Sequence, residues 1–320
     1  MTKIAFLGTL TTTGVVLMVK AILTLKPDSS YNDKREEWYH FPQTYLNQIR
    51  NSLGDWFIYY EPRRLSTHLN KAGGKQAYFA VGKIADIKSD LHNEGHYYAK
   101  IEKYLDFDHM VSFKEGDFYY EGGLVKEDGS TNKGAFGRAV RNIEDHEYEA
   151  ILRAGFEFSL IGEEKYYRRN AEPVQEFGEG EQQEFERPIV EKLVARPFRD
   201  DAFRFSVRHA YNETCAMTGL KIINGGGRPE VQAAHIMPVA DKGPDSIRNG
   251  LALSGTVHWM FDRGLLSLDD EYRILTADEY LPPQVKHLLN SSGRITLPER
   301  SEFFPHPRYL EFHRKTFFKG

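Results

Sequence analysis

Apolar and aromatic residues alternate with polar ones in several segments of the N-terminal half, a pattern typical of β-strands. The clearest segments are 54–62 (GDWFIYYEP), 76–87 (QAYFAVGKIADI), 96–107 (HYYAKIEKYLDF) and 116–123 (GDFYYEGG). Glycine-containing turn signals separate them. A first strand is expected within 17–27 (LMVKAILTLKP). This half of the chain is therefore predicted to be β-rich.

Helical periodicities of apolar residues appear further along the chain. Residues 144–156 (EDHEYEAILRAGF) predict a helix that ends near Gly155, and 196–219 predict a helix that enters a turn at Gly219. A strand is expected at 229–236, then a loop, then a helix that begins at Ser254 or Thr256 and ends at Gly264. The order of elements predicts an α+β fold with four parts: an extension (1–17), a β-rich domain (18–165), an acidic linker rich in Glu, Gln and Gly (166–195) and a C-terminal domain (196–320).

Composition narrows the class of protein. Hydrophobic residues make up 40% of the chain and charged residues 28%, as in soluble globular proteins. The net charge of −4 gives no global basic field, so contacts with nucleic acid must come from local patches. The single cysteine, Cys215, excludes an internal disulfide and a multi-cysteine zinc site, and we expect it to be a packing residue. A reducing cytoplasm is the expected location. The apolar segment 4–25 carries several threonines and Lys20, so no membrane association is expected.

The segment 231–268 concentrates chemistry-bearing residues. His235 lies at the end of the predicted strand, Asn249 precedes Gly250 in a turn signal, and His258 and Asp262 are four residues apart on one helix face. An imidazole beside a carboxylate suits a divalent transition metal or Mg²⁺. Taken singly, each residue could have a purely structural role. His258 could be a packed core histidine, Asn249 a turn residue, and Asp262 a surface carboxylate paired with Arg263. The ordered set favours a functional site.

The order and spacing of His235, Asn249 and His258, with their flanking AAHIMP, RNGLAL and HWMFDRGLLSL, resemble the HNH (ββα-metal) endonucleases of bacterial restriction type. The resemblance implies a small ββα-metal fold for the C-terminal domain. It implies that His235 is the general base and that Asn249 holds the His235 loop or adds a ligand oxygen. His258 and Asp262 would bind Mg²⁺ or Mn²⁺, with Zn²⁺ or Ni²⁺ as alternatives. Many family members carry a metal ligand immediately before the base, where this chain has Ala234.

The N-terminal segments 31–49, 54–64 and 95–108 resemble the region that precedes this same lobe in restriction endonucleases. The domain is also similar to the PUA superfamily, which includes the SRA, EVE and YTH readers of modified bases, and we therefore expect a PUA-like barrel. Such a reader extrudes a base and stacks it between aromatic rings. The candidates are Tyr39, Phe41, Trp56, Tyr59, Tyr60, Tyr97 and Tyr98. Strand alternation places Trp56 and Tyr59 on opposite faces, so part of this set is expected in the core.

Cationic side chains give a second set of candidates for DNA contact. Arg63 and Arg64 follow a predicted strand, and Lys133, Arg138 and Arg141 flank the glycines of the loop 131–143. Such a loop is suited to a phosphate backbone, and it is equally typical of a solvated surface.

These features together predict a metal-dependent DNA endonuclease that hydrolyses phosphodiester bonds, with the character of a modification-dependent restriction enzyme that acts in phage defence. The expected partner is double-stranded DNA with a modified cytosine. A homodimer is expected because cutting both strands requires two sites. Two alternatives stay open: a modified-DNA binding protein with a degenerate nuclease lobe, and an HNH nuclease that does not sense modification.

Overall fold

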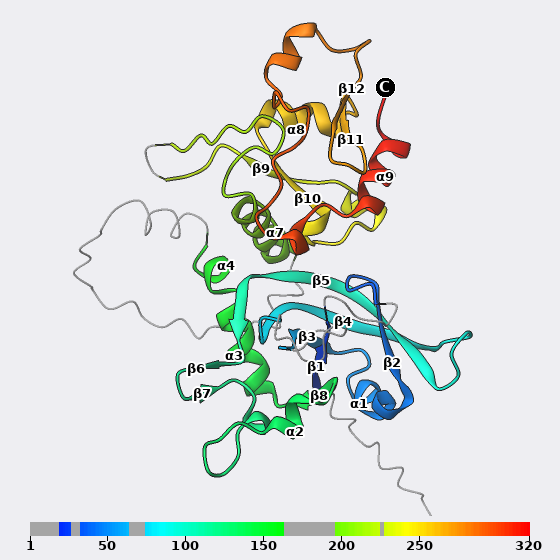
Figure 1. Cartoon of the computed structure of the whole chain (residues 1–320), viewed down its shortest axis with the longest axis vertical. Coiled ribbons are helices and arrows are strands. Elements are labelled where there is room, and N and C mark those ends of the chain that lie inside the picture. Colours follow the sequence, from blue (N-terminus) through cyan, green and yellow to red (C-terminus); the bar gives the residue numbers. More distant parts are fainter. Residues whose placement is uncertain (1–18, 27–32, 64–73, 163–195, 225–226) are drawn as a thin grey trace, which may run out of the picture.

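A computed structural model describes residues 19–26, 33–63, 74–162, 196–224 and 227–320. The expected extension (1–17) and acidic linker (166–195), and the candidate Arg64, lie outside the described residues. The described chain forms two lobes, an N-terminal lobe (19–162) and a C-terminal lobe (196–320), shown in Figure 1.

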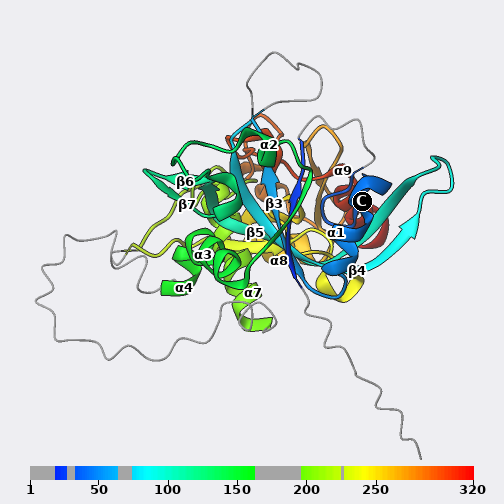
Figure 2. The ribbon, with the colours of Figure 1, turned by 90° about the horizontal axis from the view of Figure 1, so that it is seen from below.

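The N-terminal lobe is built on one six-stranded sheet of strand order β2-β5-β4-β3-β1-β8. Its strands are β1 (Lys20–Thr24), β2 (Trp38–Pro42), β3 (Trp56–Glu61), β4 (Ala77–Ser89), β5 (His96–Ser112) and β8 (Val140–Ile143). Strands β1 and β3 are parallel, and the other pairs are antiparallel. The long strands β4 and β5 carry register shifts and bend (Figures 1 and 2), because bulges increase the local twist of a sheet. The expected barrel is thus a curled sheet with open edges at β2 and β8.

Helices cover both faces of this sheet. The lobe's helices are α1 (Leu46–Asn51), α2 (Lys133–Phe136), α3 (Asp145–Gly155) and α4 (Glu157–Ile161), with a small hairpin of β6 (Lys114–Glu115) and β7 (Phe118–Tyr119) and the 3-10 helices η1 (Gln43–Tyr45) and η2 (Gly122–Leu124). Trp56 and Ile58 face the core that includes α3, while Phe57 and Tyr59 face the core that includes α1. The predicted alternation along this strand is confirmed, and both sets of side chains are buried.

The C-terminal lobe begins with a helix and continues as two strands and a second helix. Its elements are α7 (Arg196–Ala210), β9 (Gln232–His235), β10 (Gly250–Leu253), α8 (Gly255–Asp262), β11 (Leu266–Leu268), β12 (Ile274–Thr276) and α9 (Pro307–Thr316), with the 3-10 helices η3 (Val239–Asp241), η4 (Ile247–Asn249), η5 (Pro283–His287) and η6 (Ser301–Phe303). Strands β9 and β10 are antiparallel, as are β11 and β12.

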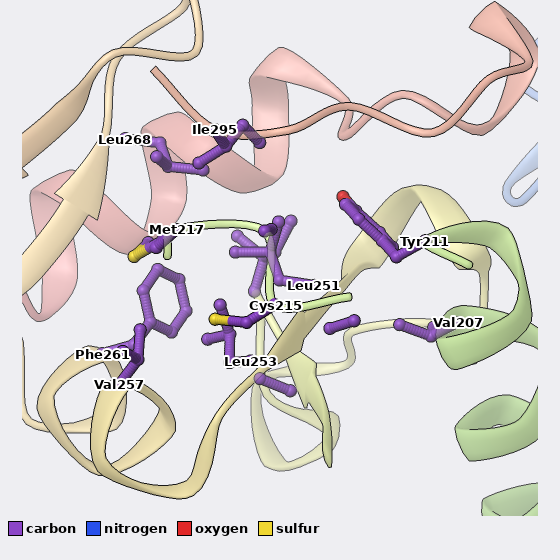
Figure 3. Close-up of a cluster of buried hydrophobic side chains, with 14 of the residues drawn as sticks. Val207, Tyr211, Cys215, Met217, Leu251, Leu253, Val257, Phe261, Leu268 and Ile295 are labelled. Atoms are coloured by element: carbon purple, nitrogen blue, oxygen red, sulfur yellow. The ribbon is translucent and has the colours of Figure 1, made fainter. Parts of the chain in front are cut away.

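One apolar core unites the C-terminal lobe (Figure 3). It joins side chains of α7, β10, α8 and β11, among them Val207, Leu251, Val257 and Phe261. Cys215 lies fully buried within this core, as expected of a packing residue.

Helix α7 connects the two lobes. Its residues Phe203 and Val207 pack in the C-terminal core, and Ala202 packs in the N-terminal core that includes α3. Figure 1 shows α7 between β5 and the β9–β10 pair, and the helix contacts all three strands. The C-terminal lobe is therefore joined to the sheet of the N-terminal lobe by a shared helix.

Several expected elements differ from the structure. The predicted strand 116–123 contains only the two-residue β7, followed by a 3-10 helix. The helix expected over 196–219 ends at Ala210, because Asn212 and Glu213 adopt left-handed backbone angles with φ of 48° and 57°. Strands β2, β8 and β10 were not predicted as strands. Among the described residues, no helix is long and apolar enough to span a membrane.

Candidate functional site

His235 is the last residue of β9 and is held by groups from other elements. Its ring stacks on Phe203 of α7, with ring centroids 3.8 Å apart and an angle of 11° between the planes. Its Nε2 lies 3.1 Å from Oδ1 of Asp245. About 20% of the His235 side chain stays exposed. The imidazole is therefore fixed in orientation and still accessible to a small molecule.

Asn249 is fully buried and ties the loop between β9 and β10 together. Its Oδ1 accepts from the Met237 backbone N–H at 2.9 Å, and its Nδ2 donates to the carbonyls of Met237 (2.9 Å) and Pro244 (3.0 Å). All side-chain bonds of Asn249 thus go to the backbone of its own loop. These bonds are those of a residue that holds its loop, and the two expected roles of Asn249 stay predictions.

His258 and Asp262 lie on one face of α8, as the spacing predicts. His258 Nε2 is 3.4 Å from Oδ2 of Asp262, and its Nδ1 is 2.9 Å from Oε1 of Gln232 on β9. The helix ends at Asp262, and Gly264 beyond it has φ of +68° and leaves no room for a side chain because the Phe317 carbonyl oxygen approaches it closely. His258 is partly exposed and is not packed in the core.

These side chains meet in one hollow. His235, His258 and Asp262 line a cavity of about 430 Å³, together with Asp200 and Arg204 of α7. The hollow lies where β9, α7, α8 and α9 come together, so residues that are up to 117 positions apart in sequence (200 and 317) share one surface. Three of the four residues singled out in the segment, His235, His258 and Asp262, therefore share one hollow, and Asn249 lies outside its lining.

The donors of this hollow fit a divalent cation. His258 and Asp262 supply an imidazole nitrogen and a carboxylate oxygen that already lie side by side. Within the described parts of the chain, no group of three or more His, Cys, Asp or Glu side chains is placed to hold a metal. A two-ligand site is compatible with Mg²⁺, which keeps several waters and is completed by phosphate oxygens. Ala234 lies in the apolar core opposite Leu251, so no ligand comes from that position.

A third histidine of the hollow, His313, packs against α8. His313 of α9 is buried, stacks on Phe261 at 3.9 Å, and lies within hydrogen-bond distance of Ser267 Oγ and the Phe261 carbonyl. Burial lowers the pKa of His313 to about 4, despite the opposing effect of the carbonyl. This neutral ring packs α9 against α8.

Five of the seven aromatic candidates for base stacking are buried, including Tyr60, whereas Tyr97 and Tyr98 of β5 are partly exposed. Tyr39, Phe41 and Tyr59 lie in the core that includes α1, and Trp56 lies in the core that includes α3. Tyr39 and Phe41 stack on each other with ring centroids 6.2 Å apart. The structure therefore does not bring these four side chains to a common surface. Their contact with a base stays a prediction.

The cationic candidates differ in exposure. Arg63, Lys133 and Arg138 are exposed, whereas Arg141 is buried and makes a two-bond pair with Glu121 at 2.7 and 2.8 Å. Arg138 and Arg141 line a hollow of about 820 Å³ beside α1 and α2. The paired Arg141 is fixed by the fold, and Arg63, Lys133 and Arg138 remain the candidates that are accessible to DNA.

The sequence reasoning missed the side chains that hold His235. Asp245 and Arg199 bond each other through Oδ2 and Nη2 at 2.5 Å, and Phe203 stacks on the His235 ring. Arg199 and Phe203 are four residues apart on α7, so they lie on one face of that helix. The only available signal was this spacing, which is common in helices that pack against a core.

Comparisons with known proteins bear on the same segment. Residues 215–269 match the model of an HNH endonuclease family. No curated protein matches the chain. Among solved structures, the chain is similar to the modification-dependent TagI restriction endonuclease, at 15% identity over 92% of this chain and 81% of that one, with a TM-score of 0.30. It is also similar to the type IV phosphorothioation-dependent restriction endonuclease ScoMcrA, at 12% identity over 75% of this chain and 46% of that one, with a TM-score of 0.18.

The two solved structures are too dissimilar, at these TM-scores, to establish a shared fold. The family match spans His235, Asn249, His258 and Asp262, and the structure gathers His235, His258 and Asp262 in one hollow whose loop Asn249 secures. Residues 215–269 therefore form an HNH endonuclease domain, and the protein is a nuclease.

Proposed function

We propose that the protein is a divalent-metal-dependent DNA endonuclease that hydrolyses phosphodiester bonds. The observation that carries this proposal is the common hollow of His235, His258 and Asp262, in which an oriented imidazole lines the same space as an imidazole and a carboxylate of types that ligate divalent metals. A phosphodiester needs both functions, since a water must lose a proton as it attacks and the phosphate must be stabilised as its charge develops.

Each residue has a defined part in this reaction. His235 takes the proton from the attacking water, and its ring is oriented by the Phe203 stack and the Asp245 carboxylate. Asn249 keeps the loop after β9 in place. His258 and Asp262 are the residues that would hold the cation. When bound there, a cation supplies Lewis-acid stabilisation of the phosphate and of the leaving oxygen.

The proposed substrate is double-stranded DNA that carries a modified cytosine, cut by a homodimer in the cytoplasm as a defence against phage DNA. This part rests on the resemblance of the N-terminal segments 31–49, 54–64 and 95–108 to those of restriction endonucleases. Exposed Arg63, Lys133 and Arg138 are the proposed contacts to the phosphate backbone.

One observation favours a second candidate, an HNH nuclease that does not sense modification. Five of the seven aromatic side chains proposed to stack a flipped base are each at most 6% exposed and pack in two different cores, namely Tyr39, Phe41, Trp56, Tyr59 and Tyr60. A lobe of this kind serves equally as a structural support for the nuclease site.

The two candidates are separated by cleavage of matched duplexes with Mg²⁺ or Mn²⁺ at fixed salt. The duplexes carry cytosine, 5-methylcytosine, 5-hydroxymethylcytosine or glucosylated hydroxymethylcytosine. Cleavage confined to modified duplexes, and lost in His235→Ala, supports the first candidate. Equal cleavage of all four supports the second. Absence of cleavage with either metal contradicts both and favours a DNA-binding protein with a degenerate nuclease lobe.

A further inference from the structure

Asp245 is almost completely buried, with 1% of its surface exposed, and it bridges the side chains of His235 and Arg199. Its Oδ1 lies 3.1 Å from Nε2 of His235, and its Oδ2 accepts from Nη2 of Arg199 at 2.5 Å. A buried carboxylate is costly unless its oxygens are bonded. Here one oxygen is bonded by a cation and the other is turned towards the imidazole. The Arg199 bond thus fixes the direction in which Asp245 faces His235.

The segment that carries Asp245 is held from the N-terminal lobe. Leu105 of β5 forms an isolated parallel bridge with Asp245. The next residue of that strand, Asp106, accepts from the Ile247 backbone N–H through Oδ2 at 2.9 Å, and its Oδ1 accepts from Tyr104 at 2.6 Å. Asp106 is 3% exposed. Strand β5 therefore hydrogen-bonds to the loop between β9 and β10 directly beside Asp245.

A second contact from the same lobe reaches the next residues of the loop. Glu36 Oε1 accepts from Ser246 Oγ at 3.4 Å and from Arg248 Nη1 at 3.3 Å. Glu36 is 7% exposed, and Ser246 is fully buried. On its other side the loop is secured by Asn249. Residues 244–249 thus lie between the two lobes, and side chains of both lobes form buried hydrogen bonds with them.

We infer that Asp245 is a positioning residue for His235 and that the N-terminal lobe, through Asp106 on β5, completes the nuclease site. The inference rests on the proposed role of His235 as the general base. A carboxylate at Nε2 accepts the hydrogen carried there, so Nδ1 is the nitrogen with a free electron pair. A group held in this way keeps the ring in one tautomer and stabilises the imidazolium that forms.

The proton balance follows from this arrangement. Nδ1 of His235 removes a proton from the attacking water, whose oxygen forms a bond to phosphorus as the bond from phosphorus to the leaving oxygen breaks. The proton stays on the imidazolium, whose opposite N–H faces Asp245. The leaving oxygen takes its proton from solvent. Asp245 accepts a hydrogen bond throughout and touches no reacting atom.

A structural role for Asp245, as the partner of Arg199 alone, makes a different prediction. A residue that acts through His235 matters only when His235 is present, because groups that work as one unit are strongly non-additive. A residue that only supports the fold lowers cleavage by the same factor in any background.

The test is a double-mutant cycle on the full chain with His235→Ala, Asp245→Asn and the double variant. Cleavage of one duplex is timed with enzyme in excess and Mn²⁺ present. Asp245→Asn is expected to lower the cleavage rate by about 100-fold with unchanged DNA affinity, the size typical of residues that orient a functional group. In the His235→Ala background the same change is expected to alter the residual rate by less than about twofold, since its partner is absent.

Equal losses in both backgrounds, or a wild-type rate in Asp245→Asn, would overturn the inference. A His235→Ala variant that cuts like wild type would instead contradict the proposed function, so the two failures are distinguishable.

The part played by the N-terminal lobe is tested with Asp106→Asn and Asp106→Ala. Asp106→Asn leaves either Tyr104 or Ile247 without its acceptor, and Asp106→Ala leaves both without one. In each variant the cleavage rate is expected to fall about 10-fold or more with unchanged DNA affinity. The matched control is Glu102→Gln, an exposed position on the same strand, which should cut like wild type. Wild-type rates in both Asp106 variants, or an equal loss in Glu102→Gln, would show that β5 does not position the loop.

Discussion

The clearest quantitative prediction concerns Asn249. Replacing it with alanine removes three hydrogen bonds, of 2.9, 2.9 and 3.0 Å, between its amide and the backbone of Met237 and Pro244. At roughly 1 kcal/mol net for each bond, the free energy of unfolding should fall by about 3 kcal/mol. The loop also carries Asp245, so cleavage should be lost together with stability.

Asn249→Asp separates the donors from the acceptor. The aspartate keeps the oxygen that accepts from Met237 and replaces the two donor hydrogens with a charge beside two carbonyl oxygens. We expect it to destabilise the lobe at least as much as Asn249→Ala.

The assay is chemical denaturation of each variant, followed by fluorescence, with cleavage measured in parallel. The matched control is Asn47→Ala, an exposed position on α1, which should stay within about 0.5 kcal/mol of wild type. An Asn249→Ala variant within 1 kcal/mol of wild type would refute the reasoning that these bonds hold the loop.

Three further predictions follow from the same geometry. Gly243→Ala should distort the loop and abolish cleavage, because a side chain there would meet the Met237 carbonyl oxygen at 1.9 Å; a fully active variant would contradict this. His258→Ala or Asp262→Ala should weaken apparent metal affinity about 10–100-fold, so that a Mn²⁺ titration of cleavage shifts to higher concentration, whereas an unshifted titration would exclude them as ligands. Burial raises the pKa of Asp108 from 3.8 to about 7. Between these two pH values the folded protein keeps a proton on Asp108 that the unfolded chain has lost. The free energy of unfolding therefore falls as pH rises through this range, by up to about 4 kcal/mol. Asp108→Asn should therefore raise Tm more at pH 8 than at pH 4, and an equal change at both would contradict the cause given.

The strands that the sequence predicts correctly are those with a long, regular alternation. Segments 54–62 and 76–87 became β3 and β4, and the expected division between the faces at Trp56 and Tyr59 is confirmed by the two cores. The short strands were missed for a physical reason. Strand β10 (GLAL) is buried at every position, so it shows no alternation to distinguish it from a buried turn or helix segment.

The exposure of the aromatic side chains could not be predicted from the sequence. Alternation states which residues share a face, but not whether another layer covers that face. Here α1 and α3 lie on opposite faces of the sheet, so both Tyr59 and Trp56 are buried. The end of α7 could not be predicted from the sequence either. Asn212 and Glu213 both adopt left-handed backbone angles, but of the two only asparagine favours that conformation.

The candidate site was predictable to the extent that it is local in sequence. His235, Asn249, His258 and Asp262 lie within 28 positions (235 to 262), and the structure gathers them around one loop and one hollow. The side chains that orient His235 come from elsewhere: Phe203 and Arg199 from α7, through packing that only the fold creates. Asp245 stood within the motif, but in GPDS it reads as a turn residue.

The most direct test of the nuclease site is the initial rate of cleavage of one duplex by wild type and by His235→Ala, with Mn²⁺ present and with the metal removed by chelation. If His235 is the general base of a metal-dependent site, wild type cuts only with the metal, and the substitution lowers the rate by about 10²–10⁴-fold without loss of DNA binding. Equal rates for the two proteins, or cleavage that persists after chelation, would contradict that assignment.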